Sequence, residues 1–284
     1  MSVRVFTFVY GNYFDWFERT VASLCWPKNR AALDGAVWSV YTNEGGQSSV
    51  ERILSPAGLK VEVKTLHVEP NVGKQMATCL QAEMKACEID GSGLLLAPPD
   101  TIFGEGSIPA IVNLGMEGHN AISVPHPRVL SDTFPDIREP TSNARLVKLA
   151  IENMHEVWQL ANIKLEKNNS WYSGAGWRHL QDNLYAVTMR IPTPYFIRPI
   201  HGDNDVMISS GPGGWDHKWP QHLVKDQRHR IIGSSDAAFM VELSRKDLPQ
   251  GPVRDSNRDD LDAYRGTLLH HQVNRNTVTI WRAE

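Results

Sequence analysis

Residues 3–97 alternate short apolar strands with amphipathic helices, and this alternation constrains the fold more than any other feature of the sequence. The predicted elements are, in chain order, strand 3–9, helix 14–24, strand 36–41, helix 50–54, strand 59–68, a helix between Gly73 and Gly91, and strand 94–97. Strands joined by helices form parallel sheets with helices on both faces. Because such crossovers are right-handed, the loops that follow the strands gather along one edge. The sequence therefore predicts an α/β fold with a mixed, mostly parallel sheet flanked by helices.

Asp100 lies where the last of these strands must stop. Leu94–Ala97 is short and wholly apolar, which is typical of a strand buried on both faces. Pro98 and Pro99 cannot donate to a central ladder, so we expect the strand to end there. Asp100 would then lie at the carboxyl end of a central strand, where open α/β sheets bind ligands. The alternative is an Asp that only caps a turn after two prolines.

The character of the sequence changes near residue 125, and four prolines follow between residues 125 and 140. We predict an α/β half, residues 1–124, fused to an irregular half, residues 125–284, in a single compact domain. Further predicted elements are helix 108–116 with Ser107 as its N-cap, strand 120–124, helix 143–155 and strands 184–189 and 195–198.

Net charge, cysteine spacing and the length of the apolar runs narrow the functional and structural classes that the protein can belong to. The formal net charge of −3 gives no general attraction to nucleic acid or to an anionic membrane. The three cysteines, Cys25, Cys79 and Cys87, lack CxxC spacing and are expected to be buried free thiols. No apolar run approaches the ~20 residues that span a bilayer, and the start lacks the apolar core of a signal peptide. We therefore expect a soluble, cytoplasmic protein without a membrane span.

Several common motifs are missing from the sequence. No G-x-G-x-x-G follows the first strand, and no G-x-x-x-x-G-K-[ST] occurs, which argues against a dinucleotide-binding fold and a P-loop. No G-x-S-x-G elbow is present, so a hydrolase nucleophile has no obvious position.

The order of strands and loops resembles the glycosyltransferases of the GT-A fold. The resemblance rests on strand 3–9 ending at Tyr10-Gly11, strand 36–41 ending at Tyr41-Thr42, and Asn71-x-Gly73-Lys74 opening a helix before strand 94–97. In that family the first strand's loop holds the base and ribose of a nucleotide sugar. A carboxylate motif, usually Asp-x-Asp, ends the fourth strand and binds the divalent metal at the diphosphate. Here the motif reads Pro98-Pro99-Asp100, so metal binding is weaker or is completed from elsewhere.

This resemblance covers roughly residues 3–124. The continuation after Asp100 and the helix that begins near Arg145 are similar to uncharacterised bacterial and phage glycosyltransferase-like proteins. The resemblance implies a nucleotide-sugar donor, with UDP as the expected nucleotide, and Mn²⁺ or Mg²⁺ as cofactor. The donor contacts that it implies are Thr7, Tyr10, Gly11, Thr42, Lys74, Pro99 and Asp100.

The resemblance also implies a metal ligand and acid–base groups in the second half of the chain. His217 is the candidate second metal ligand beside Asp100, since Mn²⁺ accepts imidazole as well as oxygen. Asp216 is the candidate general base toward the acceptor hydroxyl, and Asp236 a second acid on the acceptor side. Each residue also has a purely structural interpretation: an Asx-turn at Asp216 and a helix N-cap at Asp236.

Three functions fit these features. The first is a hexosyltransferase-type enzyme that moves a sugar from a nucleotide sugar to an acceptor hydroxyl on a glycan, a protein, a small molecule or a modified nucleic acid. The second is a non-catalytic GT-A-like domain that binds a nucleotide or glycan. The third is a metallophosphoesterase, suggested by His201-Gly202-Asp203 and Asp216-His217, although the loops after the first two strands offer it no further ligands.

Overall fold

The computed structural model describes residues 2–67, 72–124, 128–152, 176–180, 184–188, 195–199, 229–231, 238–244 and 280–282. Its helices are η1 (Gly11–Tyr13), α1 (Phe14–Leu24), α2 (Pro27–Ala32), α3 (Gln47–Leu54), η2 (Ser55–Ala57), α4 (Val72–Asp90), α5 (Ser107–Met116) and α6 (Asn143–Glu152). Its strands are β1 (Val3–Val9), β2 (Val37–Asn43), β3 (Lys60–Leu66), β4 (Gly93–Leu96), β5 (Thr101–Phe103), β6 (Ala121–Ser123), β7 (Arg128–Leu130), β8 (Gly176–Leu180), β9 (Leu184–Thr188), β10 (Phe196–Ile197), β11 (His229–Ile231), β12 (Met240–Ser244) and β13 (Ile280–Arg282).

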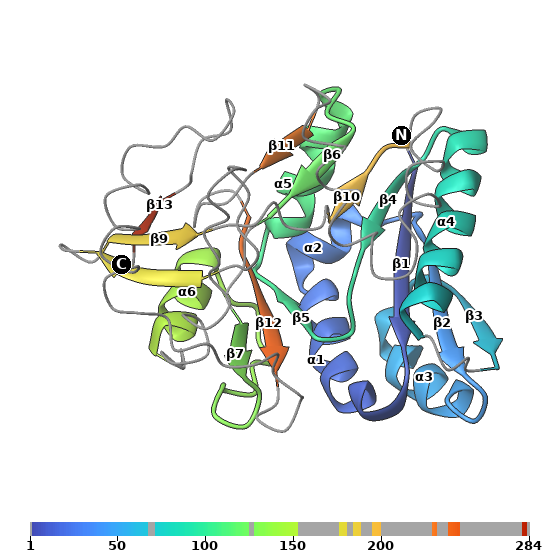
Figure 1. Cartoon of the computed structure of the whole chain (residues 1–284), viewed down its shortest axis with the longest axis horizontal. Helices are drawn as coiled ribbons and strands as arrows, with labels where there is room; N and C mark the ends of the chain where they lie inside the picture. Colours follow the sequence, from blue (N-terminus) through green and yellow to red (C-terminus); the bar gives the residue numbers. More distant parts are fainter. Residues whose placement is uncertain are drawn as a thin grey trace.

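Within the described residues, a seven-stranded sheet forms the centre of the fold, in the order β11-β6-β10-β4-β1-β2-β3 (Figure 1). Strands β1 to β4 pair in parallel, as do β6 and β11. Strand β10 is antiparallel to both of its neighbours, β4 and β6. This arrangement confirms the predicted α/β class, a mixed and mostly parallel sheet flanked by helices.

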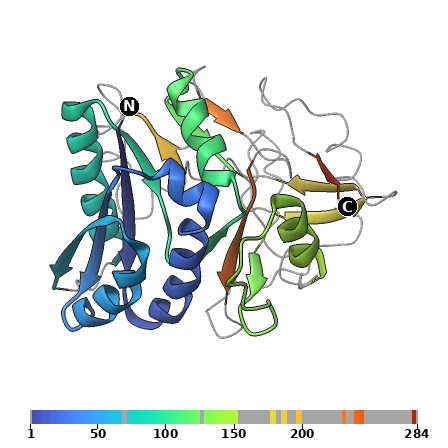
Figure 2. The ribbon, with the colours of Figure 1, turned by 180° about the vertical axis from the view of Figure 1, so that it is seen from behind.

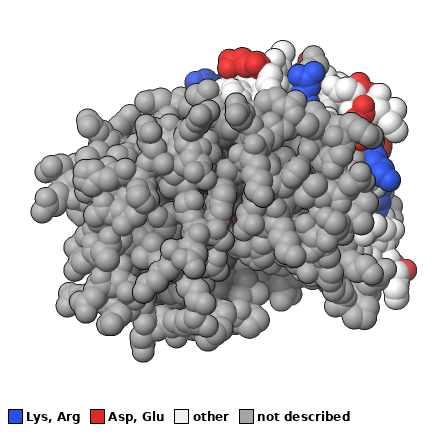
Figure 3. Space-filling model, turned by 45° about the horizontal axis from the view of Figure 1, so that its top comes forward, with Lys and Arg blue, Asp and Glu red and all other residues white. Residues whose placement is uncertain are grey.

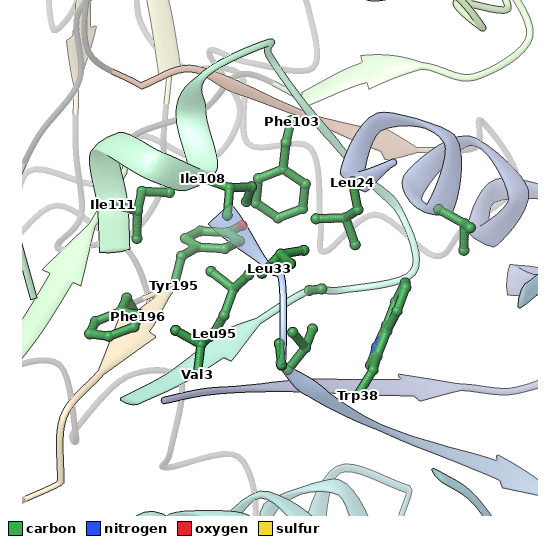
Figure 4. Close-up of a cluster of buried hydrophobic side chains, with 14 of the residues drawn as sticks. Val3, Leu24, Leu33, Trp38, Leu95, Phe103, Ile108, Ile111, Tyr195 and Phe196 are labelled. Carbon is green, nitrogen blue, oxygen red and sulfur yellow. The ribbon is translucent and has the colours of Figure 1, made fainter. Parts of the chain in front are cut away.

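Alternate side chains of each central strand pack against helices on opposite faces of the sheet. Val5 and Val9 of β1 join the cluster that includes Phe17 of α1, Val50 of α3 and Ile111 of α5. Figure 4 shows part of this cluster, with Trp38, Leu95 and Phe196 from the sheet facing Leu24 and Ile108 from the helices.

The opposite face is covered by α4, as Figures 1 and 2 show from the two sides. Phe6 and Phe8 of β1 pack there with Cys79, Leu80 and Met84 of the helix. We call this group of side chains the α4-face cluster. Its remaining buried members are Tyr41, Cys87, Leu94, Leu96, Ala121 and Ile197, with Tyr10, Leu66 and Met76 packed against it.

A second, smaller sheet continues the fold beyond Asp100. Its order is β5-β12-β7, with β12 antiparallel to β5 and parallel to β7. It packs with α6 and with Trp16 of α1 around a separate apolar cluster. A third sheet, β13-β9-β8, pairs segments that lie about 100 residues apart in the sequence, and its side chains are outside the described part of the chain.

The structure corrects three local predictions. Pro27 ends α1 as expected but also occupies the first turn of α2, a position that suits proline and that the sequence interpretation missed. Strand β5, directly after Asp100, was not among the predicted elements. Ser107 is the first residue of α5 and not its N-cap; its hydroxyl accepts the N–H of Phe239 at 2.9 Å. Asn29 of α2 caps this helix instead, through its Oδ1 and the N–H groups of Gly106 and Ile108.

Other predictions are confirmed. Strand β4 is buried on both faces and lies between β1 and β10, so Asp100 follows a central strand. The cysteines are free, and Cys79 and Cys87 are buried on α4. Among the helices that the structure describes, none is long and apolar enough to cross a membrane. The division at residue 124 stays a prediction.

Candidate functional site

The carboxyl ends of β1 and β4 meet at the point where the chain reverses its path across the sheet. From β1 the chain proceeds to β2 and β3 on one side, and then returns through α4 to β4 on the other side. In open α/β sheets this topological switch point leaves a crevice outside the strand ends, and ligands bind there. Tyr10 and Gly11 follow β1, and Pro98 to Asp100 follow β4, so both predicted loops lie at this switch point on the carboxyl edge of the sheet.

Gly11 gives the first loop its sharp exit from the sheet. Its φ of +56° lies in the left-handed region, which glycine adopts without a steric penalty. The chain turns there into η1 and α1, and the N–H of Tyr13 donates to the carbonyl of Tyr10 at 3.2 Å. This turn leaves Tyr10 as the last extended residue of the strand, at the edge of the sheet.

Tyr10 is held in a row of aromatic rings and lies within electrostatic range of Asp100. Its ring centroid is 5.6 Å from that of Phe8 and 5.5 Å from that of Tyr13. Burial raises the pKa of the Tyr10 phenol, and the negative charge of Asp100 raises it further. The phenol therefore stays protonated at neutral pH and can donate a hydrogen bond. The structure thus brings together two of the residues that the sequence singled out.

The turn that carries Asp100 is fixed from two sides. Thr20 of α1 accepts the N–H of Thr101 at 3.2 Å, and the carbonyl of Asp100 accepts the N–H of Leu243 in β12 at 2.7 Å. Pro99 is buried, and the Asp100 side chain is partly exposed. These contacts place the carboxylate on a rigid turn between the two sheets, which is what an orienting or metal-binding group requires.

The two threonines of the expected donor contacts have buried side chains. The Thr7 hydroxyl donates to the carbonyl of Ala97 at 2.7 Å and accepts the indole N–H of Trp38 at 2.9 Å. Thr42 is fully buried, and its Oγ1 lies close to Gly46 and has no hydrogen-bond partner among the described residues. Both side chains are therefore buried, and the Thr7 hydroxyl is already hydrogen-bonded within the fold; their contact with a donor stays a prediction.

The other predicted site residues lie partly or wholly outside the described structure. Lys74 belongs to the first turn of α4, but its side chain is not described. Asp216, His217 and Asp236 lie outside the described residues, as does the segment 201–205. Within the part of the chain that the structure describes, no three His, Cys, Asp or Glu side chains come together as a metal site. Asp100 alone does not supply the oxygen ligands that Mg²⁺ or Mn²⁺ needs.

Three residues on the same edge were missed by the sequence interpretation. Glu44 follows β2 and lies with its Oε2 3.4 Å from Nδ1 of His67, which follows β3. Gln75 in α4 donates to the carbonyl of His67 at 2.6 Å. Glu44 comes three residues after the predicted strand 36–41, and that position was the signal that could have identified it; His67 lies inside the predicted strand 59–68 and follows β3 only in the structure.

Charged side chains of both signs lie close together on the described part of the face in Figure 3. This mixture agrees with the small net charge of −3 and offers no single-sign surface there for a polyanion.

The sequence matches no family model and no curated protein. Among solved structures, the chain is similar to 4-diphosphocytidyl-2C-methyl-D-erythritol synthase from Anaerococcus prevotii, at 9% identity and a TM-score of 0.42, over 93% of this chain and 96% of that one. It is also similar to the inositol-1-phosphate CTP transferase from T. maritima, at 11% identity and a TM-score of 0.41, over 86% of this chain and 89% of that one. Likeness at this level does not establish what the chain binds.

Proposed function

We propose that the protein is a glycosyltransferase that moves a sugar from a nucleotide-sugar donor, UDP-linked in the first instance, to an acceptor hydroxyl. The observation that carries the proposal is that Tyr10 and Asp100 follow the neighbouring parallel strands β1 and β4, at the switch point of the sheet. An aromatic ring and a carboxylate on two neighbouring strand ends suit a ligand with a flat base at one end and a diphosphate at the other.

Each group has a distinct task in this proposal. Tyr10 offers a ring face to the base and a protonated phenol as donor. Asp100 would hold a Mg²⁺ or Mn²⁺ ion with His217 and the donor's own phosphate oxygens; when bound, that ion would offset the charge that grows on the leaving diphosphate. Lys74, in the first turn of α4, would add a positive charge at the phosphates. Asp216 or Asp236 would accept the proton of the acceptor hydroxyl.

The lone carboxylate also supports a second candidate, a domain of the same fold that binds a nucleotide or glycan without turnover. A metallophosphoesterase would need several Asp and His ligands at the early strand ends, and no such group of three comes together in the described part of the chain.

A thermal-shift screen with UDP, GDP, CMP, TDP and ADP sugars, each with and without Mn²⁺ or Mg²⁺, tests the proposal. A ligand that binds only the folded state stabilises it by about 2.7 kcal/mol at one hundred times its Kd, so no acceptor is needed. We expect one nucleotide family to raise the Tm, more strongly with metal, and slow metal-dependent hydrolysis of that donor. Binding without hydrolysis or transfer would favour the binding domain. No shift with any sugar, or a shift with nucleoside triphosphates alone, would contradict the proposal.

Asp100→Ala is expected to abolish the metal-dependent part of the shift and the hydrolysis, because it removes the carboxylate that the described residues place after β4 at the switch point. The unliganded Tm should change by no more than about 3 °C, since Asp100 is partly exposed and its turn is held by backbone contacts. Asp34→Ala removes an exposed carboxylate from the loop before β2 and is the matched control. A large fall in Tm with an unchanged donor shift would show that Asp100 is structural.

A further inference from the structure

One carboxylate on α4 accepts hydrogen bonds from side chains of β2 and β3 and forms an ion pair with a side chain of β1. Glu83 is 2% exposed and, with Arg19, is one of the two charged residues buried within the described residues. Its Oε1 accepts the hydroxyl of Tyr41 at 2.7 Å and the ammonium of Lys64. Lys64 also lies 3.1 Å from the Tyr41 oxygen, and Arg4 places a guanidinium nitrogen 3.8 Å from Glu83 Oε2.

Attaching a helix to a sheet through this buried charged network costs free energy of desolvation. A buried charge loses its hydration, and apolar side chains of similar volume often give equal or greater stability. Apolar contacts already attach this face of α4 to the sheet, since Leu80, Met84 and Cys87 bury their side chains there. Directional hydrogen bonds provide what apolar contacts do not: they define the rotation and the axial position of the helix.

The part of α4 that depends on this position lies at the candidate site. Gln75 donates to the carbonyl of His67, which follows β3 at the carboxyl edge. Met76 packs against the α4-face cluster together with Tyr10, the aromatic residue at the switch point. Lys74 lies in the first turn, nine residues before Glu83, or about 13 Å along the axis. A rotation or slide of α4 would therefore move its first turn relative to Tyr10.

We propose that Glu83, through Tyr41 and Lys64, is a positioning residue that sets the first turn of α4 against the nucleotide site. The inference rests on the proposed function, because it assigns this network to the binding of the donor's nucleotide. Glu83 does not touch the ligand. It acts through the helix that carries Lys74 and whose Met76 packs, as Tyr10 does, against the α4-face cluster.

The test separates positioning from stability. The triple variant Tyr41→Phe, Lys64→Met, Glu83→Met removes every charge of the contact between Glu83 and Lys64 and leaves neither Tyr41 nor Glu83 with an unpaired polar group. We expect its Tm to stay within about 3 °C of the natural protein, since an apolar replacement of a buried ion pair is often neutral. Its Kd for UDP with Mn²⁺, measured by calorimetry, should rise about tenfold. Glu83→Gln keeps an acceptor for Tyr41 and Lys64, and its Kd should rise less than about threefold.

Arg52→Gln is the control, because it removes a more exposed ion pair, 3.2 Å to Glu18, between α3 and α1 on the other face of the sheet. Its Kd should be unchanged. If the triple variant does not fold, Lys64→Gln replaces it, and a weaker Kd at an unchanged Tm is again the expected result.

Each outcome has a definite meaning. If the triple variant, or Lys64→Gln in its place, binds UDP as tightly as the natural protein, the positioning role is wrong and the proposed function stands. If affinity and Tm fall together in every variant, Glu83 is only structural. If the natural protein binds neither UDP nor any other nucleotide of the screen, the proposed function is wrong and this inference falls with it.

Discussion

At the scale of single residues, Thr7 was expected to contact the donor because it lies in the strand that ends at Tyr10-Gly11, but its side chain is part of the buried core. Its side chain is fully buried and joins the Ala97 carbonyl of one neighbouring chain segment to the Trp38 indole of β2. The sequence predicts β1 correctly, because a run of β-branched and aromatic residues before a turn is a local signal. The partners of Thr7 lie 31 and 90 residues away, so no local pattern could show that its hydroxyl was already engaged.

Thr7→Val should lower the free energy of unfolding by about 2 kcal/mol, because it leaves the Trp38 N–H and the Ala97 carbonyl buried without a partner while the volume is nearly conserved. Thr7→Ser keeps the hydroxyl and should cost about 1 kcal/mol for the lost methyl group. Urea denaturation measures both values. Nucleotide affinity should not change in either variant. A Thr7→Val protein with native stability and weaker binding would return Thr7 to the donor site.

At the scale of elements, the local helices and strands are predictable and their long-range partners are not. The periodicity of apolar residues, together with the glycines and prolines that end helices and strands, locates α1, α4, β1 and β4 to within a few residues. The same signals miss β5, which is three residues long and gains its stability from β12, some 140 residues later in the chain. They also cannot show that β10 inserts antiparallel between β4 and β6, a pairing that decides the order of the sheet.

The insertion of β10 depends on two glycines that make room for Phe196. A Cβ at Gly93 of β4 or at Gly115 of α5 would lie 2.1 Å from the Phe196 ring, which is fully buried. Gly115→Ala should gain up to about 1 kcal/mol of helix propensity but lose more, about 2–3 kcal/mol, to overpacking. We expect a net loss of about 1–2 kcal/mol in urea denaturation.

The matched control is Gly115→Ala made beside a smaller side chain at position 196. In a Phe196→Leu background the clash is relieved, so Gly115→Ala should become neutral or stabilising, and the double-mutant cycle should show a coupling of about 1 kcal/mol or more. Additive effects of the two changes would show that the ring does not limit the space at Gly115.

At the scale of the whole molecule, the sequence predicts where a ligand should bind better than it predicts how the ligand is held. Asp100 and Tyr10 are each identifiable from a strand that ends abruptly, and topology alone brings them together. The network of Glu83, Lys64 and Tyr41 is invisible in the sequence, because a glutamate in an amphipathic helix is normally exposed. Only the packing of α4 across three strands shows that this one is buried.

Two carboxylates of α4, Glu83 and Asp90, bind side chains of the sheet. Their pKa values determine how the stability of the folded protein changes at acid pH. Burial raises the pKa of Glu83, but hydrogen bonds from Lys64 and Tyr41 outweigh it, and the net pKa lies below the ordinary value. Burial likewise raises the pKa of Asp90, and hydrogen bonds from Ser92 and Arg4 bring it below its ordinary value. Each group therefore binds a proton less readily in the folded than in the unfolded protein.

The sign of the effect follows from this difference. The stabilisation is complete above the unfolded pKa values, about 4.3 for Glu and 3.9 for Asp, and it is lost as the pH falls through the lower folded values. The free energy of unfolding should therefore fall between about pH 5 and about pH 3. The triple variant at Tyr41, Lys64 and Glu83 lacks the glutamate and should lose less over the same interval, whereas Arg52→Gln should follow the natural protein. Urea denaturation of these three proteins at the two pH values gives the three differences in the free energy of unfolding that are needed. Equal losses in the triple variant and the natural protein would mean that Glu83 contributes no ionised partner to the folded state.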